Sequence, residues 1–168
     1  MFIINFKKEK FLHLEPIKND DRRWFCELTR NEWGSEIIIS RGKMHYAKTL
    51  EGFITFEKKN RVGVITYKII NNECEIVSLN SLKENRGVGS FLLDNIERFA
   101  HSKGCTRVWL VSTNDNTKAL RFFQKKGFKI RQIYPDIMKE YRILKPELPL
   151  IGENGIEIRD EIELEKIF

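Results

Sequence analysis

A glycine-containing turn, RGVG at residues 86–89, stands between a strand-like run and an amphipathic helix. The first amides of a helix lack carbonyl partners and lie at the positive end of the helix dipole. Gly87 and Gly89 have no side chains that would keep a phosphate from these amides, while Arg86 and Lys83 add positive charge. The segment therefore predicts an anion-binding site. The alternative is a strand-to-helix turn that uses glycine only for its backbone freedom.

A predicted β-meander precedes this turn. Its three β-rich runs are joined by the short polar turns KKN and NN, which is typical of antiparallel strands, and they cover residues 52–57, 62–70 and 74–82. Residues 87–104 follow with apolar side chains on one helical face and a glycine at the end. The sequence thus predicts three paired strands that lead directly into the helix of the anion site.

The other predicted elements complete a layered arrangement. They are a strand over residues 2–8, a helix over 17–33 with Asn19 or Asp20 as its N-cap, a strand over 106–113, a helix over 116–126 and a strand over 128–134. Residues 135–144 are compatible with a helix, whereas 155–168 mix the helical and strand periods. The order β-α-βββ-α-β-α-β predicts one domain of the α+β or mixed α/β class.

Composition and charge restrict the function classes. The 168 residues are 41% hydrophobic and 32% charged, an ordinary globular composition without the roughly 18-residue apolar run of a membrane span. We see no signal peptide and expect a cytoplasmic protein with no membrane partner. Residues 151–168 carry six acids and two bases, a net charge of −4. Because the whole chain has a net charge of +6, the remaining residues carry a net charge of +10. A basic body suits a polyanionic ligand, but no nucleic-acid-binding motif is present, so we expect no nucleic-acid partner.

The three cysteines, Cys26, Cys74 and Cys105, are an odd number and widely spaced. Neither a CxxC pair nor a histidine at metal-ligand spacing accompanies them. The sequence therefore predicts neither a disulfide framework nor a zinc site. We expect buried free thiols and no bound metal.

A second motif, NDNTKALRFFQKKGF at residues 114–128, lies downstream of the glycine turn. Its Asn116, Ala119 and Phe123, followed by Gly-Phe, resemble the helix-and-strand signature of the GNAT superfamily of acyl-CoA N-acyltransferases. From about Trp24 to its end, the chain is also similar to a group of uncharacterised bacterial GNAT proteins. The runs that carry this similarity are EIVSLNSL, TNDNTKALRFFQKKGF, LKPELPLIGENGI and IRDEIELE.

The resemblance implies a fold and a cosubstrate. The fold is the GNAT type, a mixed and mostly antiparallel central sheet that is flanked by helices and splayed between its fourth and fifth strands. One N-acetyltransferase domain would span residues 1–168, with 145–168 as a C-terminal extension. The cosubstrate is acetyl-CoA or another short acyl-CoA, with its pyrophosphate on the amides of residues 86–90. Its pantetheine arm would pair with the strand edge at Leu79 and Ser81.

The cofactor-binding residues implied by the resemblance lie on the strand edge, the glycine turn and the second motif. They are Leu79, Ser81, Glu84, Arg86, Gly87, Val88, Gly89, Ser90, Asn116, Ala119 and Phe123. One departure from the common family pattern concerns the pyrophosphate. Glu84 stands where many members have Gln or Arg three residues before the first glycine, so amides and Arg86 would carry this binding.

A second departure, Phe123, bears on the chemistry because many members have a tyrosine there that protonates the departing thiolate. A general acid contributes roughly 10² to 10⁴ in rate. A thiol with a reference pKa of about 8.5 is nevertheless a tolerable leaving group without such help. Phe123 thus weakens the case for a fast enzyme without excluding catalysis, and Tyr134 or Tyr141 would be other sources of a hydroxyl.

Acyl transfer to an amine needs a base, because an alkylamine with a pKa of about 10 is mostly protonated at neutral pH. Glu75 is the first candidate, since a similarly placed strand glutamate is the base in the histone-acetylating branch of the superfamily. The alternative is an exposed strand glutamate paired with a lysine. His45, in a predicted loop, is the second candidate, with a plain surface residue as its alternative. A backbone amide near Leu79 is expected to stabilise the developing oxyanion.

The acceptor is only weakly encoded. In this superfamily the acceptor pocket is shaped by segments before the meander and after the last helix. Trp24, Trp33 and Tyr46 would either wall such a pocket or fill the core. The acidic run RDEIELE, residues 159–165, would either attract a cationic amine or form a solvated face.

Two function classes follow. The first is an N-acetyltransferase that moves an acetyl group from acetyl-CoA directly to a primary amine of a small molecule or peptide. The second is a non-catalytic acyl-CoA-binding or regulatory module on the same fold, which Glu84 and Phe123 motivate. A competent base beside the thioester position would separate the two. In either class we expect a monomer or a homodimer.

Overall fold

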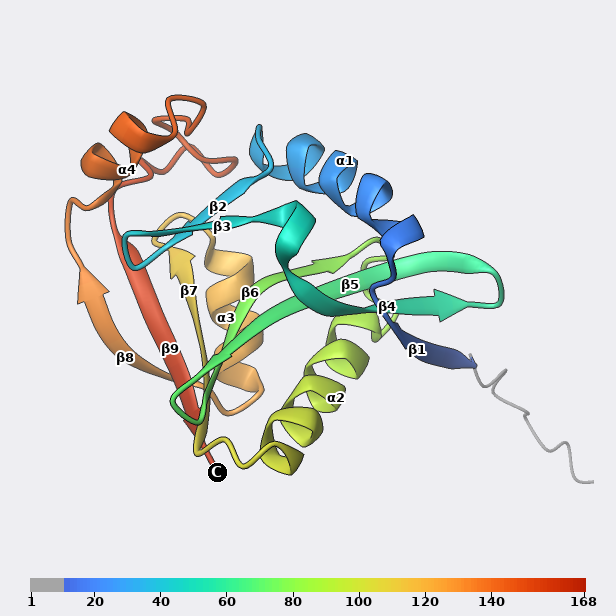
Figure 1. Cartoon of the computed structure of the whole chain (residues 1–168). Helices are drawn as coiled ribbons and strands as arrows, with labels where there is room; N and C mark the ends of the chain where they lie inside the picture. Colours follow the sequence, from blue (N-terminus) through green and yellow to red (C-terminus); the bar gives the residue numbers. More distant parts are fainter. Residues whose placement is uncertain (1–10) are drawn as a thin grey trace, which may run out of the picture.

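This computed structural model describes residues 11–168. Within these residues, a seven-stranded mixed sheet forms the centre of the structure (Figure 1). The strands of the sheet are β1 Leu12–Pro16, β4 Glu51–Glu57, β5 Asn60–Ile70, β6 Glu73–Ser81, β7 Arg107–Thr113, β8 Lys129–Tyr134 and β9 Glu161–Ile167. They lie in the order β1-β4-β5-β6-β7-β9-β8, in which only β6 and β7 are parallel neighbours. The predicted mixed and mostly antiparallel sheet is confirmed.

Helices flank the sheet. They are α1 Arg22–Trp33, α2 Val88–Ser102, α3 Thr117–Lys125 and α4 Met138–Leu144, with short 3-10 turns η1 Asn19–Asp21 and η2 Ala47–Thr49. The N-cap prediction for α1 is wrong: the cap is Asp21, because the 3-10 turn η1 takes up the residues before it. The other predicted helices are confirmed with small shifts at their ends. The predicted strand over residues 2–8 lies outside the described residues.

Two apolar cores lie on opposite faces of the sheet. On one face, α2 and α3 pack against β5, β6 and β7, where Leu92, Ile96 and Val108 are fully buried. On the other face, Phe25 of α1 packs in a cluster with Ile54 of β4. Burial of each such side chain contributes about 1.5–3 kcal/mol. The two cores therefore hold the strands in place although the sheet opens between them.

The strands β6 and β7 separate soon after they meet. Residues 73–75 pair with residues 107–109, and no further pair joins the two strands along 76–81. In β6, Val77 has no partner in the register with β5, which marks a bulge, and a bulge bends its strand. The predicted splay between the fourth and fifth predicted strands is confirmed at this point. Within the described chain, one edge of β6 is left without a strand partner.

A second, two-stranded sheet lies across the central one (Figure 1). Its strands, β2 Ile37–Ser40 and β3 Lys43–Tyr46, form a hairpin where the sequence predicts a loop. Arg41 and Gly42 at its tip have φ values of 49° and 73°, as a two-residue hairpin turn requires. The prediction failed because this turn carries Arg-Gly in place of the favoured Asn-Gly.

The end of the chain lies inside the sheet. Strand β9 runs antiparallel to both of its neighbours, β7 and β8. Its residue Leu164 is fully buried in the core on the α2 side. The segment 145–168, expected as a C-terminal extension, thus supplies an interior strand.

Removal of residues 161–168 should abolish cooperative thermal unfolding. The deletion leaves both β7 and β8 without their shared partner and opens the core around Leu164. Circular dichroism melting of the truncated chain should show a broad, shallow change, whereas deletion of Phe168 alone should keep the sharp transition. A truncated chain that melts as sharply as the full chain would show that β9 is dispensable for the fold.

Candidate active site

The opening between β6 and β7 leads to the predicted glycine turn. Gly87 is the N-cap of α2 with a φ of 78°, and Asn85 before it has a φ of 54°. The amides of Val88, Gly89 and Ser90 begin the helix, where no carbonyl lies one turn earlier to bind them. A Cβ added at Gly87 would meet nothing within 4 Å. The turn therefore has free amides and the open space that an anion needs.

The charged side chains around the turn are partly engaged with one another. Lys83, expected to assist the anion site, forms an ion pair with Glu57. Glu84 accepts a hydrogen bond of 2.5 Å from Lys118 of α3. Arg86 is exposed. Lys118 thus offsets the negative charge that Glu84 brings to the turn, and Arg86 is the cation within the turn itself.

Strand β6 and helix α3 both approach the first turn of α2. A Cβ added at Gly89 would lie 3.5 Å from the Phe122 ring and 3.7 Å from Leu79 Cδ2. Leu79 comes from the unpartnered part of β6 and Phe122 from α3. At the end of β6, the Ser81 hydroxyl donates to the Lys83 carbonyl at 3.0 Å. The unpaired edge of β6, the glycine turn and one face of α3 therefore lie next to one another.

The remaining residues of the second motif start α3 and fix it to the core. Asn116 is the N-cap of α3, and its side-chain oxygen accepts the Ala119 N–H at 3.1 Å. Phe123 is 6% exposed, with its ring in edge contact with those of Phe122 and Phe128. The structure thus gives Asn116 a capping contact and Phe123 a core contact, and both lie on the helix that borders the opening.

Glu75 lies at the last paired position before β6 and β7 separate, opposite Trp109. The residue is only 6% exposed. The Ser40 hydroxyl of the hairpin donates to its Oε1 at 2.5 Å, and His45 Nε2 lies 3.5 Å from the same oxygen. The alternative prediction of an exposed glutamate is therefore wrong, and the two candidate bases lie side by side.

His45 differs from its expected environment. It stands on β3, not in a loop, and is only 4% exposed, so the prediction of a surface residue is wrong. Within residues 11–168 its Nε2 makes no hydrogen bond. The contact with Glu75 becomes an ion pair when the ring is protonated. The hairpin therefore brings a titratable group over the end of the opening.

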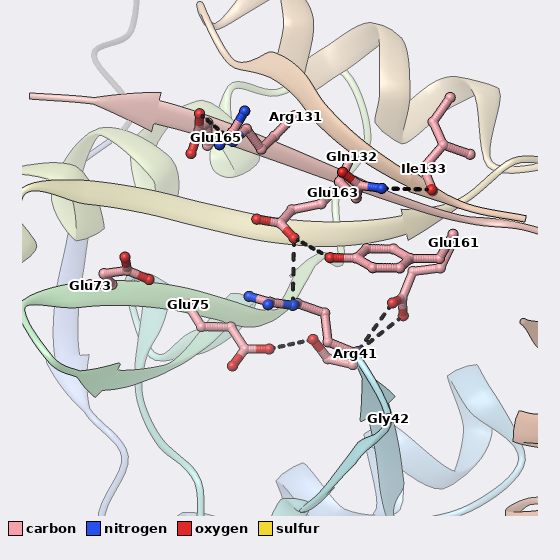
Figure 2. Close-up of polar contacts among 12 residues, drawn as sticks. Arg41, Gly42, Glu73, Glu75, Arg131, Gln132, Ile133, Glu161, Glu163 and Glu165 are labelled. Atoms are coloured by element: carbon pink, nitrogen blue, oxygen red, sulfur yellow. Dashed lines mark hydrogen bonds and ion pairs between the residues drawn. The ribbon is translucent and has the colours of Figure 1, made fainter.

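A row of glutamates on β9 shares this face of the sheet with Glu75 (Figure 2). Glu161 and Glu163 are 1% and 3% exposed, while Ile162 and Leu164 between and beside them face the opposite core. The alternative prediction of a solvated acidic face is therefore wrong for Glu161 and Glu163. Their carboxylates are buried and require partners.

Glu161 joins the hairpin tip to α4. Its Oε1 accepts hydrogen bonds from the Tyr141 hydroxyl at 3.0 Å and from the Arg41 backbone N–H at 3.1 Å. Burial, with the neighbouring carboxylates of Glu163 and Glu75, raises the pKa of Glu161 to about 7. Near neutral pH this carboxyl group therefore exists in both protonation states.

Glu163 is bound by two donors. The Tyr134 hydroxyl donates to Oε2 at 2.9 Å, and Arg107 donates to Oε1 at 3.2 Å. Arg107 also pairs with Glu73 and Glu165, so its guanidinium ties β6, β7 and β9 together at the closed end of the opening. Tyr134, considered as a source of a hydroxyl, is thus engaged with Glu163.

An open cavity of about 660 Å³ has His45 in one of its walls. Its other lining residues come from β3, η2, the start of β4, β5 and the C-terminal end of α2, and include Met44, Tyr46, Tyr67 and Phe99. Tyr46 was expected either to wall a pocket or to fill the core, and it lines this cavity at 45% exposure. The cavity provides room for a ligand beside His45.

The predicted tryptophans lie on α1. Trp24 packs partly buried against the core on that face, with the Arg61 guanidinium 5.0 Å from its ring centroid. Trp33 is the last residue of α1 and is partly buried. The tryptophan beside Glu75 is instead Trp109, which the sequence did not single out.

Other features of the described chain concern membranes, metals and thiols. Among residues 11–168, no helix is long and apolar enough to cross a membrane. The same residues contain no group of three or more His, Cys, Asp or Glu side chains arranged to hold a metal ion. The prediction for the cysteines is confirmed, because Cys26, Cys74 and Cys105 are free and buried.

Comparison with known families identifies the fold. The model of the Acetyltransferase (GNAT) family matches residues 15–128, more than half of the chain. The chain belongs to the GNAT acetyltransferase family. The matched residues include the splayed strands, the glycine turn and α3. This GNAT protein is therefore an acyltransferase.

Two relatives of this GNAT protein come from Bacillus subtilis (strain 168), and both are called uncharacterised. YdhI is 42% identical over 137 residues, 80% of this chain and 85% of its own length. YxbD is 37% identical over 139 residues, 82% of this chain and 87% of its own length. These similarities cover most of the chain and leave the acceptor open.

Solved GNAT structures share the fold at low sequence identity. An IAA acetyltransferase from Bacillus cereus ATCC 14579 has a TM-score of 0.72 and 20% identity, covering 94% of this chain and all of its own. A GNAT acetyltransferase from Elizabethkingia anophelis with acetyl-CoA bound has a TM-score of 0.73 and 20% identity, covering 96% and 100%. An acetyltransferase from Bacillus subtilis in complex with CoA has a TM-score of 0.70 and 21% identity, covering 94% and 99%.

Sequence reasoning missed the residues that close the site from the hairpin and β7. These are Ser40, Arg41 and Trp109. The Ser40 hydroxyl donates to Glu75, and Trp109 lies opposite Glu75 in the sheet. The Arg41 backbone N–H donates to Glu161, and the Arg41 side chain forms an ion pair with Glu163. A period-two pattern in EIELE places the glutamates on one face of a strand. That pattern alone does not reveal that a distant hairpin covers this face.

Replacing both Gly87 and Gly89 by Ala should weaken acetyl-CoA binding while the fold persists. At Gly87 the positive φ makes Ala unfavourable by about 1 kcal/mol, and at Gly89 the added Cβ makes only ordinary contacts. Both methyl groups would hinder an anion that approaches the helix amides. Calorimetric titration with acetyl-CoA measures the loss, and thermal melting confirms the fold. Unchanged affinity in a folded variant would contradict the anion-site prediction.

Glu161→Gln should change how stability depends on pH. The raised pKa means that the folded protein holds a proton which the unfolded chain releases between about pH 4.5 and 7. The free energy of unfolding therefore falls as pH rises through this window, and then levels off. Relative to Glu161→Gln, the wild type should lose about 1–3 kcal/mol between about pH 5 and about pH 8. Urea unfolding at both pH values measures this difference, and parallel curves would show that Glu161 does not titrate there.

Proposed function

We propose that this protein is an N-acetyltransferase that passes an acetyl group from acetyl-CoA directly to a primary amine of a small molecule or peptide. The observation that carries the proposal is Glu75, a buried carboxylate at the point where β6 and β7 separate. A carboxylate in this position is suited to take a proton from an amine held at the opening. The acetyl-CoA bound to the Elizabethkingia anophelis structure supports the choice of cosubstrate.

The residues around the opening fit acetyl-CoA. The free amides of Val88, Gly89 and Ser90 and the exposed Arg86 suit a pyrophosphate. The unpartnered edge of β6 suits the amide groups of a pantetheine arm, which would bind like an added strand. Asn116 and Ala119 would line the far side at the start of α3, with the Phe122 ring beside Gly89, whereas Phe123 packs in the core. Acetyl-CoA supplies the activated acetyl group, and the chain supplies position and proton transfer.

Proton transfer from the acceptor is the role that we assign to Glu75. The protonated amine gives its proton to the carboxylate, directly or through a water molecule, and the free nitrogen then attacks the thioester carbonyl carbon. A carbon–nitrogen bond forms, the second proton of the attacking nitrogen passes to solvent, the carbon–sulfur bond breaks, and the thiolate of CoA leaves. A backbone amide near Leu79 would stabilise the negative charge on the carbonyl oxygen. The hydrogen bond from the Ser40 hydroxyl orients the carboxylate.

The thiolate leaves without a tyrosine acid in this scheme. Phe123 has no hydroxyl and packs in the core, and the hydroxyls of Tyr134 and Tyr141 donate to buried carboxylates. A thiol with a reference pKa of about 8.5 is a tolerable leaving group, so solvent supplies the proton after departure. The reaction therefore depends more on its base than on an acid.

Glu75→Gln tests the proposed base. The amide keeps the size of the side chain and an acceptor for the Ser40 hydroxyl but cannot take a proton. With each of a panel of amines, thiol release from acetyl-CoA should fall by about 10² to 10⁴, while acetyl-CoA affinity measured by calorimetry stays the same. The matched variant His45→Gln, which removes the neighbouring imidazole, should lower the rate much less.

Two results would contradict the proposal in different ways. An acetyl-CoA affinity that falls together with the rate would place Glu75 in cosubstrate binding. Tight acetyl-CoA binding without thiol release for any polyamine, amino acid, aminoglycoside or peptide N-terminus would favour a non-catalytic acyl-CoA-binding module. In that second case, the opening binds the cosubstrate but holds no acceptor.

A further inference from the structure

The tip of the hairpin places a cation on the glutamate-bearing face of the sheet (Figure 2). The Arg41 guanidinium lies over the Trp109 ring, 5.1 Å from its centroid, and Arg41 Nε is 3.6 Å from Glu163 Oε2. Trp109 is also the register partner of Glu75. An aromatic face and a carboxylate, the two groups that favour an organic cation, thus lie next to the proposed base. We call Trp109 and Glu163 the cation subsite.

Arg41 occupies this subsite loosely. Its side chain is 41% exposed, and within residues 11–168 its guanidinium makes the ion pair with Glu163 but no hydrogen bond. Glu163, in contrast, receives hydrogen bonds from Tyr134 and Arg107. An ion pair with a partly exposed partner contributes little to stability. The guanidinium can therefore leave without stranding the Glu163 carboxylate, and another cation can take its place.

The charges on the face around the subsite are balanced. Its carboxylates are Glu73, Glu75, Glu161, Glu163 and Glu165, and its cations are Arg41, Arg107 and Arg131 together with Lys68 and Lys129, the register partners of Glu75 and Glu165. Displacement of Arg41 by a ligand cation keeps this balance, whereas its displacement by a neutral group leaves one negative charge uncompensated. The balance therefore favours a cationic ligand over a neutral one.

His45 gives an independent indication of a ligand at the base. Its Nε2 is buried and makes no hydrogen bond in the described chain, although it points at Glu75 Oε1 from 3.5 Å. Buried polar atoms without partners are uncommon in folded proteins. An amine nitrogen beside these two groups would satisfy both, as a donor to the carboxylate and to the imidazole. The structure therefore offers one amine position at Glu75 and a second cation position at Trp109.

We propose that the acceptor carries two cationic groups. The reacting primary amine lies beside Glu75 and His45, and a second ammonium or guanidinium group lies on the cation subsite that Arg41 fills in the free protein. The acceptor class is then linear diamines and amino-guanidines. This inference rests on the proposed function, because it specifies the acceptor of that reaction. Arg41 competes with the acceptor for this subsite. The larger the fraction of protein molecules in which Arg41 fills the subsite, the lower the apparent affinity for the acceptor.

Arg41→Asn tests the competition. Asn-Gly is the favoured sequence for a two-residue hairpin turn with positive φ at both positions, so the hairpin should be preserved. The variant removes the Arg41 guanidinium from the subsite, while Arg107 stays bound to Glu163 and its guanidinium lies 5.6 Å from the centroid of the Trp109 ring. In the thiol-release assay with acetyl-CoA, the KM for 1,4-diaminobutane should fall about three- to tenfold. The KM for n-butylamine, which has the same chain length and no second cation, should stay the same.

Arg131→Asn is the matched control for charge. Arg131 is 65% exposed and lies 3.5 Å from Glu165 on the same face, so its loss removes one positive charge without emptying the subsite. We expect the KM of both amines to be unchanged in this variant. An equal fall for diaminobutane in Arg131→Asn and Arg41→Asn would overturn the subsite and leave only long-range attraction.

Other outcomes also decide the question. A KM for diaminobutane that is unchanged or higher in Arg41→Asn would overturn the inference, because Arg41 would then be neutral or helpful to the acceptor. A complete lack of thiol release for every amine would instead contradict the proposed function. Calorimetric titration of diaminobutane into the wild type and Arg41→Asn then still decides the subsite. Tighter binding by the variant would support it, and equal binding would overturn it.

Discussion

The short contact between β6 and β7 is the constraint on which the rest of the structure depends. Two strands that pair over only three residues leave most of their facing edges open, and a buried amide without a partner costs about 1–3 kcal/mol. The fold can keep this opening because each strand is held from its other side, β6 by β5 and β7 by β9, and from above and below by the two cores. The same unsatisfied edge is what an extended, amide-rich ligand would complete.

A second constraint acts on the glutamate-bearing face of β9, where carboxylates are kept from water. Buried charges must be paired or neutralised, and both solutions occur here. Arg107 pairs with Glu163, and the raised pKa of Glu161 keeps that group partly protonated near neutral pH. The hairpin supplies the remaining donors, the Ser40 hydroxyl and the Arg41 amide. The position of the hairpin is therefore set by the same groups that would hold an acceptor.

The sequence predicted those parts of the site whose requirement is local. An open turn with positive φ and free amides needs glycine at 87, so residue type alone revealed this turn. The cap role of Asn116 was not predicted, because the resemblance gave this residue only as one that lines the cofactor. The alternatives that made Glu75 an exposed strand residue and His45 a surface residue were wrong, because the burial of both depends on a hairpin whose Arg-Gly turn carries no common signature. The burial of Glu161 and Glu163 depends on β9 lying between β7 and β8, a pairing that spacing along the chain does not encode.

The two sides of the proposed site come from different parts of the chain. The proposed cosubstrate side comes from one continuous stretch, β6 through α3. The proposed acceptor side joins residues 40–45 to 161–163, segments that meet only in the folded protein. Substitutions in the hairpin tip or on the polar face of β9 can therefore alter acceptor choice while the glycine turn and the strand opening stay intact. Such a separation explains how proteins with one fold and one cosubstrate can differ in the amines they accept.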